Sequence, residues 1–130
     1  MTNNKNFAYL SDLHYEHQLW RNELNFYKEE LNILEHRLEE IVSKNTNNEV
    51  EAGVESFQNR FDLQRDHINI LRNSIKKHEH GLAGFAQEHP IAVDHVHFKD
   101  HSEIREKMDR FRELYLEMKN EFNRFAVKWL

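Results

Sequence analysis

Histidine is the residue type in this sequence with the clearest potential for chemistry. The chain has ten histidines in 130 residues and no cysteine. Four of the histidines fall at positions that a repeating helical pattern reserves for the apolar core: His17, His78, His97 and His101. A neutral imidazole at such a position can bind a divalent transition metal, and otherwise it needs a hydrogen-bond partner or a proton. Whether the four meet depends on the elements that carry them.

Three segments of the sequence have apolar residues spaced alternately by three and four positions, which is the pattern of a helix with a narrow buried seam. They predict helices over about residues 11–43, 49–80 and 95–129. Ser11 is the expected N-cap of the first helix, because its hydroxyl can accept a hydrogen bond from a free backbone amide. The three glycines, one proline and 32% charged residues also favour long helices.

The connections between these segments carry turn and cap signals. Residues 44–48 are rich in Asn and predict a turn, after which residues 46–49 fit a capping box. Gly81 is the expected end of the second helix, so that residues 81–93 form a packed connection. Asp94 and Ser102 are both suitable N-caps for the third helix, which leaves its start open between them.

Three stripes of similar length with short connections predict an all-α fold, an antiparallel up-down-up three-helix bundle with heptad-like core seams. The length of the chain is that of a single domain, residues 1–130. Gln64 interrupts the second stripe, and we expect it to form a buried, hydrogen-bonded polar layer near Tyr27 and Tyr115 that fixes the register.

The predicted topology brings sequence-distant histidines to one end of the bundle, where helix one starts, helix two ends and helix three starts. Counting core layers from the first turn places His17, His78 and His101 within side-chain reach of one another. His97 lies one turn further out, on the same helix face as His101. His14 flanks the seam. These five histidines are the predicted metal ligands.

Imidazole ligands suit zinc, nickel, iron and copper(II), whereas soft ligands for copper(I) are missing nearby. Three close-packed helices leave little room for haem. Acidic residues also gather at this end, where they can act as oxygen ligands or as hydrogen-bond acceptors that fix the imidazole tautomer. They are Glu16, Glu79, Asp94, Asp100 and Glu103.

The favoured function is therefore metal binding for storage, sensing or structural stapling, rather than catalysis. One alternative is that the histidines only bond water or carboxylates, and another is a proton-linked switch. A third is a non-catalytic interaction module that homodimerises or docks a partner helix through apolar residues outside the seams, Leu63, Ile70, Leu114 and Leu116. A hydrolase or oxidase using the same metal would need an open coordination position.

Composition argues against several other classes of function. The formal net charge is −5, from 18 Lys+Arg and 23 Asp+Glu, and no basic block stands out, so we do not expect nucleic-acid binding. No apolar stretch approaches the roughly 20 residues of a membrane span. The first residues lack the pattern of a signal peptide, which favours the cytoplasm. Without cysteine, disulfides and thiolate metal sites are excluded.

Overall fold

The computed structural model describes residues 9–88 and 95–130, apart from the side chains of residues 95–98. It consists of three long helices, α1 (Leu10–Lys44), α2 (Asn48–Glu88) and α3 (His95–Trp129). The prediction of an all-α fold of three helices is confirmed. In the described part of the chain, no helix combines the length and the apolar composition needed to cross a membrane.

Two of the expected helix starts differ from the structure. The N-cap of α1 is Tyr9, which makes no side-chain capping bond, so Ser11 lies inside the helix and the predicted cap is wrong. At the start of α2 the cap is Asn47, whose side-chain oxygen accepts a hydrogen bond from the Glu49 amide at 2.7 Å. An Asn directly before the first helical residue satisfies a free amide as well as a capping box does.

The predicted end of α2 at Gly81 is also wrong, because the helix continues through Gly81 and Gly84 to Glu88. A glycine inside a helix costs about 1 kcal/mol relative to alanine. Here the apolar stripe continues beyond both glycines: Leu82 is buried and Phe85 packs beside it. Burial of a leucine or phenylalanine side chain contributes roughly 1.5–3 kcal/mol, which outweighs the glycine cost.

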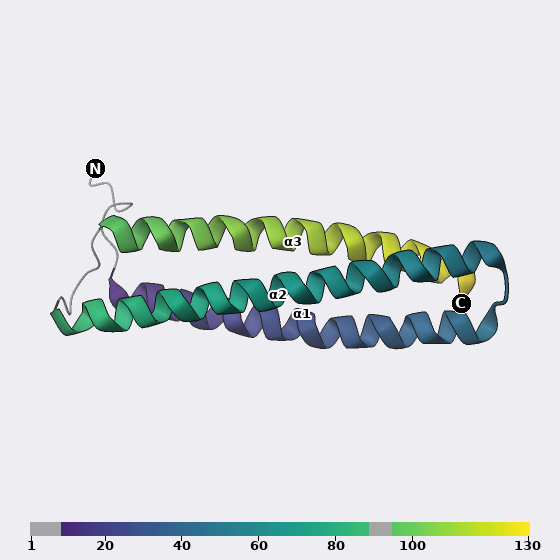
Figure 1. Cartoon of the computed structure of the whole chain (residues 1–130), viewed down its shortest axis with the longest axis horizontal. Helices are drawn as coiled ribbons and strands as arrows, with labels where there is room; N and C mark the ends of the chain where they lie inside the picture. Colours follow the sequence, from purple (N-terminus) through teal and green to yellow (C-terminus); the bar gives the residue numbers. More distant parts are fainter. Residues whose placement is uncertain (1–8, 89–94) are drawn as a thin grey trace.

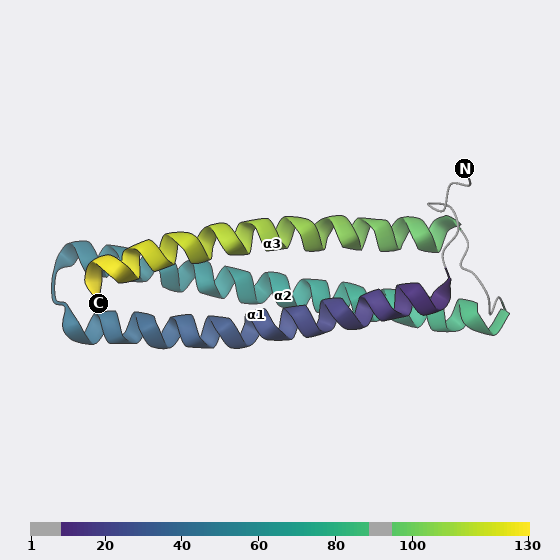
Figure 2. The same cartoon turned by 180° about the vertical axis from the view of Figure 1, so that it is seen from behind.

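The three helices lie side by side, and the end of α2 extends beyond the starts of α1 and α3 (Figures 1 and 2). The start of α1, the end of α2 and the start of α3 are at one end of the molecule, and the α1–α2 connection and the C-terminus are at the other (Figure 1). Ion pairs between α1 and α3 recur every seven residues on both helices: Glu16–Arg105, Glu23–Arg112 and Glu30–Lys119. At the far end, the Asn45 side chain donates to the carbonyl oxygens of Ile41 and Trp129.

The buried apolar side chains form two separate clusters of unequal size. The larger one fills the bundle from Trp20, Ile75 and Ile104 towards the α1–α2 connection. The smaller one contains Leu13 and Leu82, near the opposite end. Three buried polar side chains lie beside the larger cluster. His17 and His78 separate the two clusters on α1 and α2, and His101 precedes Ile104 of the larger cluster on α3. The apolar core is therefore interrupted by a layer of histidines.

Candidate metal centre

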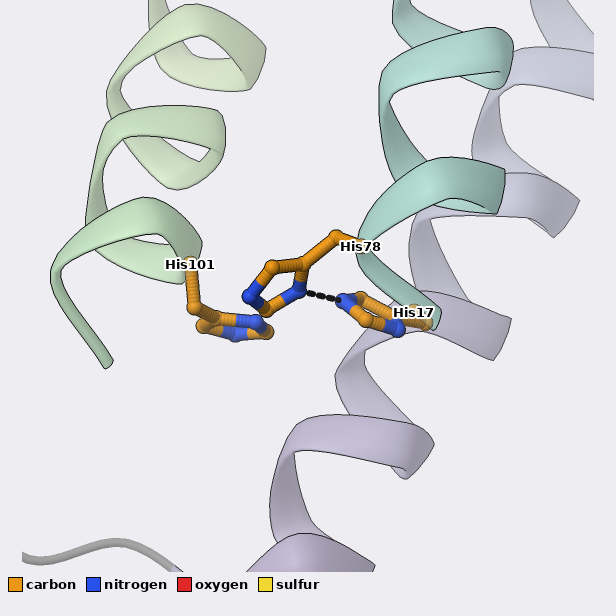
Figure 3. A group of neighbouring side chains, drawn as sticks. All are labelled: His17, His78 and His101. Atoms are coloured by element: carbon orange, nitrogen blue, oxygen red, sulfur yellow. Dashed lines mark hydrogen bonds between the residues drawn. The ribbon is translucent and has the colours of Figure 1, made fainter. Parts of the chain in front are cut away.

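The histidine layer takes one side chain from each helix, His17 from α1, His78 from α2 and His101 from α3. The three imidazoles point towards one another in the space between the helices (Figure 3). One nitrogen from each lies within 4.8 Å of the nitrogens from the other two. His17 and His101 have no solvent exposure and His78 is 8% exposed. The sequence-based expectation that these three residues meet is confirmed.

Apolar packing holds the rings in place from both sides. On one side the Trp20 indole stacks on the His101 ring, with centroids 4.8 Å apart and planes 26° from parallel. On the other side lies the smaller cluster of Leu13 and Leu82. Because the seam places a residue inwards every three or four positions, His17 follows Leu13 and precedes Trp20 on the same face of α1. His17 and His101 are therefore shielded from solvent where they meet the apolar side chains.

Carboxylates at the edge of the bundle fix the outer nitrogens of two histidines. His17 Nδ1 lies 2.5 Å from Glu79 Oε1, and His101 Nε2 lies 2.6 Å from Glu16 Oε1. An ionised carboxylate only accepts hydrogen bonds, so each of these ring nitrogens carries the proton and donates it. In the neutral rings the lone pairs are therefore on His17 Nε2 and His101 Nδ1, the two remaining ring nitrogens.

The two lone pairs have different surroundings. His17 Nε2 accepts a hydrogen bond from His78 Nδ1 at 2.9 Å, shown as the dashed line in Figure 3. His101 Nδ1 is buried and has no hydrogen-bond partner among the described residues. A buried acceptor without a partner costs roughly 1–3 kcal/mol relative to a satisfied one. A metal ion or a donor group bound between the three rings would remove this cost.

Burial keeps His17 and His101 in the neutral form that a metal requires. Burial lowers the pKa of His101 to about 4, because the cost of desolvating an imidazolium and the repulsion from His17 and His78 outweigh the attraction of Glu16. Burial also lowers the pKa of His17, although the hydrogen bond to Glu79 opposes this shift. At neutral pH both rings are unprotonated and can act as ligands.

The two carboxylates remain ionised in spite of partial burial. Burial alone would raise the pKa of Glu16, but hydrogen bonds from Arg105 and His101 outweigh it and lower that pKa. For Glu79, burial is likewise outweighed by its interactions with His17 and His14. Each carboxylate can therefore accept a hydrogen bond from an imidazole, which orients the ring and raises its basicity as a ligand.

The spacing of the three imidazoles fits a first-row divalent ion. In tetrahedral zinc coordination with bonds of 2.0–2.1 Å, neighbouring ligand nitrogens lie about 3.3 Å apart. The His17 Nε2–His78 Nδ1 distance is 2.9 Å, and no pair in the ligand set exceeds 4.8 Å. Because His78 Nδ1 donates to His17 Nε2, this nitrogen can bind a metal only after its proton has moved to His78 Nε2 or has been released.

Of the other two predicted ligands, only His14 has a described side chain, and it lies outside this group. His14 is exposed and its Nδ1 pairs with Glu79, so it contacts the carboxylate that orients His17. His97 belongs to the first turn of α3, one turn before His101, and its side chain is outside the described residues. Asp94 also lies outside them. Asp100 and Glu103 line a surface depression beside His78 between α2 and α3.

The sequence reasoning did not identify the part played by Arg105, which donates two hydrogen bonds to Glu16 at 2.7 and 3.1 Å. The sequence did contain a signal for this ion pair. Glu16 directly precedes a seam position and Arg105 directly follows one, which are the flanking positions that pair charges between coiled-coil helices. It also did not anticipate that Trp20 stacks on His101.

Comparisons with known proteins found no matching family model, no matching curated protein and no matching solved structure.

Proposed function

We propose that this chain is a metal-binding helical bundle, in which one divalent transition metal ion staples three helices together near one end. The proposed ligands are His17, His78 and His101. In this proposal the chain forms a single domain with up-down-up topology and heptad-like seams. Zinc, nickel, iron and copper(II) all suit three imidazole ligands. Zinc is the preferred probe because it is redox-inert and has no geometric preference of its own.

The observation that carries the proposal is the unpartnered, buried Nδ1 of His101 beside two further imidazoles. A purely structural polar layer would be expected to satisfy its own hydrogen bonds. Instead, Glu16 and Glu79 take the outward protons of two rings, which leaves acceptor nitrogens facing a common centre. A cation with empty coordination positions satisfies such nitrogens, and no donor among the described residues bonds to His101 Nδ1.

Burial favours a structural or storage role over catalysis. His17 and His101 have no exposed surface, so a substrate has no direct path to an ion held between them. The metal ion would connect α1, α2 and α3 where the apolar core is interrupted. His97, one turn from His101, is the proposed candidate for a fourth ligand, and His14 is the proposed partner that keeps Glu79 in position.

Zinc-dependent thermal stability tests this proposal. At a free zinc concentration 100 times the dissociation constant, binding to the native state contributes about 2.7 kcal/mol, which corresponds to a rise in Tm of roughly 10 °C. We expect this rise for the chelator-treated wild-type chain and its loss in His101→Ala. His36→Ala, which changes an exposed histidine on α1 far from the site, is the control and should respond like the wild type. No change in the wild-type Tm would refute the proposal.

A second candidate function, self-association, is favoured by apolar side chains on the outside of the bundle. Leu63, Ile70 and Leu116 are 51–61% exposed, so they do not widen the core. Ile70 and Leu114 line an apolar groove between α2 and α3. A second copy of this chain would cover that surface. Mass measurement by light scattering tests this, because Leu114→Glu should convert a dimer to a monomer, whereas a wild-type monomer would exclude it.

A further inference from the structure

A depression between α1 and α2 is lined by three cationic side chains and two amide side chains. α1 contributes Arg21, and α2 contributes Asn69, Arg72, Asn73 and Lys76. The α2 residues are spaced by one, three or four positions, which places them on neighbouring turns of one helix face. No carboxylate lines this depression. It is a local concentration of three cations on a chain whose net charge is −5.

The cations of this depression differ from those elsewhere between the helices. Other arginines that face a neighbouring helix each meet a carboxylate there, as Arg65 meets Glu35 and Arg112 meets Glu23. In the part of the chain that the structure describes, Arg21, Arg72 and Lys76 form no ion pair. Like charges that share one concave surface repel one another unless an anion lies between them.

The donor set indicates the chemistry of that anion. A guanidinium presents a planar fork of N–H donors that matches two oxygens of a phosphate group, and Arg21 and Arg72 offer two such forks from different helices. Lys76 adds a compact charge. The amides of Asn69 and Asn73 can donate to further oxygens without repelling the cations. Carboxylate ligands with only two oxygens would leave part of this donor set unused.

We propose that this depression, which we call the α1–α2 cationic groove, binds a phosphate-type oxyanion of a small molecule. A short phosphate chain fits it better than a long polyanion, because the acidic remainder of the protein repels extended nucleic acid. The proposal is independent of the metal function and uses none of its ligands. Arg21 lies four residues after His17 on α1, so the two sites are neighbours and their tests need to be separated.

Isothermal titration calorimetry of the metal-free protein with pyrophosphate tests the groove. We expect saturable binding at one site, weakened at least about tenfold in the double variant Arg21→Gln/Arg72→Gln, because charged hydrogen bonds are among the strongest in proteins. The matched control is Arg110→Gln/Arg124→Gln, which removes the same charge from exposed positions on α3 and should keep the wild-type affinity. Circular dichroism of both double variants verifies that each remains helical.

Two further ligands distinguish the source of the phosphate. If adenosine diphosphate binds like pyrophosphate, the phosphates alone are recognised, and if it binds more tightly, the ligand is a nucleotide. The proposal is overturned if pyrophosphate shows no saturable binding, or if the two double variants lose affinity equally, because a general charge effect then explains the binding. His101→Ala should bind pyrophosphate like the wild type, which separates failure of this proposal from failure of the metal proposal.

Discussion

Buried polar side chains interrupt the apolar core of this bundle at two places, and the two places differ in their surroundings. One place is the layer of His17, His78 and His101 near one end of the bundle. The other is Gln64, which precedes His78 on α2 and lies nearer the middle of that helix. Both places contain one buried polar atom without a hydrogen-bond partner among the described residues, His101 Nδ1 and Gln64 Oε1. Only the histidine layer brings ligand nitrogens from all three helices to within 4.8 Å.

The surroundings of Gln64 show why an unsatisfied atom alone does not indicate a binding site. The two tyrosines expected to pair with it bond elsewhere, Tyr27 to Glu23 and Tyr115 to Glu30. Gln64 is buried as predicted, but the hydrogen bond expected for its amide oxygen is not found among the described residues. Its amide oxygen is a single isolated acceptor. In the histidine layer, by contrast, carboxylates orient the rings, and several ligand atoms share one centre. The unpartnered oxygen of Gln64 therefore only lowers the stability of the protein, whereas the histidine layer is a candidate metal site.

The largest expected difference between the two regions is in their response to pH. Burial lowers the pKa of His101 to about 4 from a usual value of 6.5, and it also lowers that of His17. Between pH 6.5 and about 4 the unfolded chain therefore binds protons that the folded chain does not bind. The free energy of unfolding is highest above pH 6.5, and it decreases as the pH falls to about 4. For His101 the loss amounts to about 3 kcal/mol.

Urea denaturation of the metal-free protein at several pH values between 7.5 and 4 measures this loss. Glu16 and Glu79, whose pKa values are lowered in the folded chain, contribute a further loss at the acidic end of this range. Gln64 has no titrating group and contributes nothing. A free energy of unfolding that stays constant from pH 7.5 to 5 would contradict the neutral, buried state assigned to His17 and His101.

Replacing all three histidines by leucine is expected to have the next largest effect. His17→Leu/His78→Leu/His101→Leu removes buried polar atoms and joins the two apolar clusters, so the metal-free protein should become more stable by about 2 kcal/mol. The same variant should lose its response to zinc. Thermal unfolding with and without zinc measures both effects. A large loss of stability would instead show that the imidazole contacts hold the fold together without a metal.

Glu79→Gln sharpens the role of the carboxylate beside His17. The amide oxygen can still accept a hydrogen bond, but it lacks the negative charge that makes the imidazole a stronger ligand. Changes to such orienting groups typically cost 10–100-fold in metal affinity, and we expect a loss of about tenfold here. Competition with a coloured chelator gives the affinity. Glu106→Gln, at an exposed acidic position on α3, is the control, and an equal loss in both would exclude a specific role for Glu79.

The smallest expected effect is at Gln64. Gln64→Leu removes the isolated acceptor and keeps the volume similar, so the free energy of unfolding should rise by about 1 kcal/mol. Chemical denaturation measures this change. Zinc affinity should not change, because Gln64 lies on α2 four turns before His78. Reduced zinc binding in this variant would show that Gln64 and the histidine layer are coupled, and it would contradict their treatment as independent regions.

Much of this molecule could be predicted from its sequence because seam positions obey simple periodicity. The spacing of three and four residues fixed which side chains face inwards, and counting layers from the short turn brought His17, His78 and His101 together. One detail of the fold could not be predicted in this way. The end of α2 depends on whether burial of Leu82 and Phe85 outweighs the cost of Gly81, and this balance is a matter of packing.

The remaining features of the site depend on geometry between helices. Which of the nearby acids orient the rings is decided by the rotation of each helix about its axis, and among the described acids Glu16 and Glu79 do so. The α1–α2 cationic groove likewise arises because Arg21 meets α2 at the level of Arg72 rather than at a carboxylate. Both pairings follow from the register of α1 against its neighbours, which layer counting gives only to within about one turn.

X-ray absorption spectroscopy of the protein with one equivalent of zinc tests the central claim most directly. The proposal predicts three imidazole ligands with Zn–N distances of about 2.0–2.1 Å, recognisable by scattering from the outer ring atoms. It predicts one imidazole fewer in His101→Ala, if that variant still retains zinc. A spectrum with only carboxylate and water oxygens, or a wild-type chain that retains no zinc after desalting, would contradict the proposed metal centre.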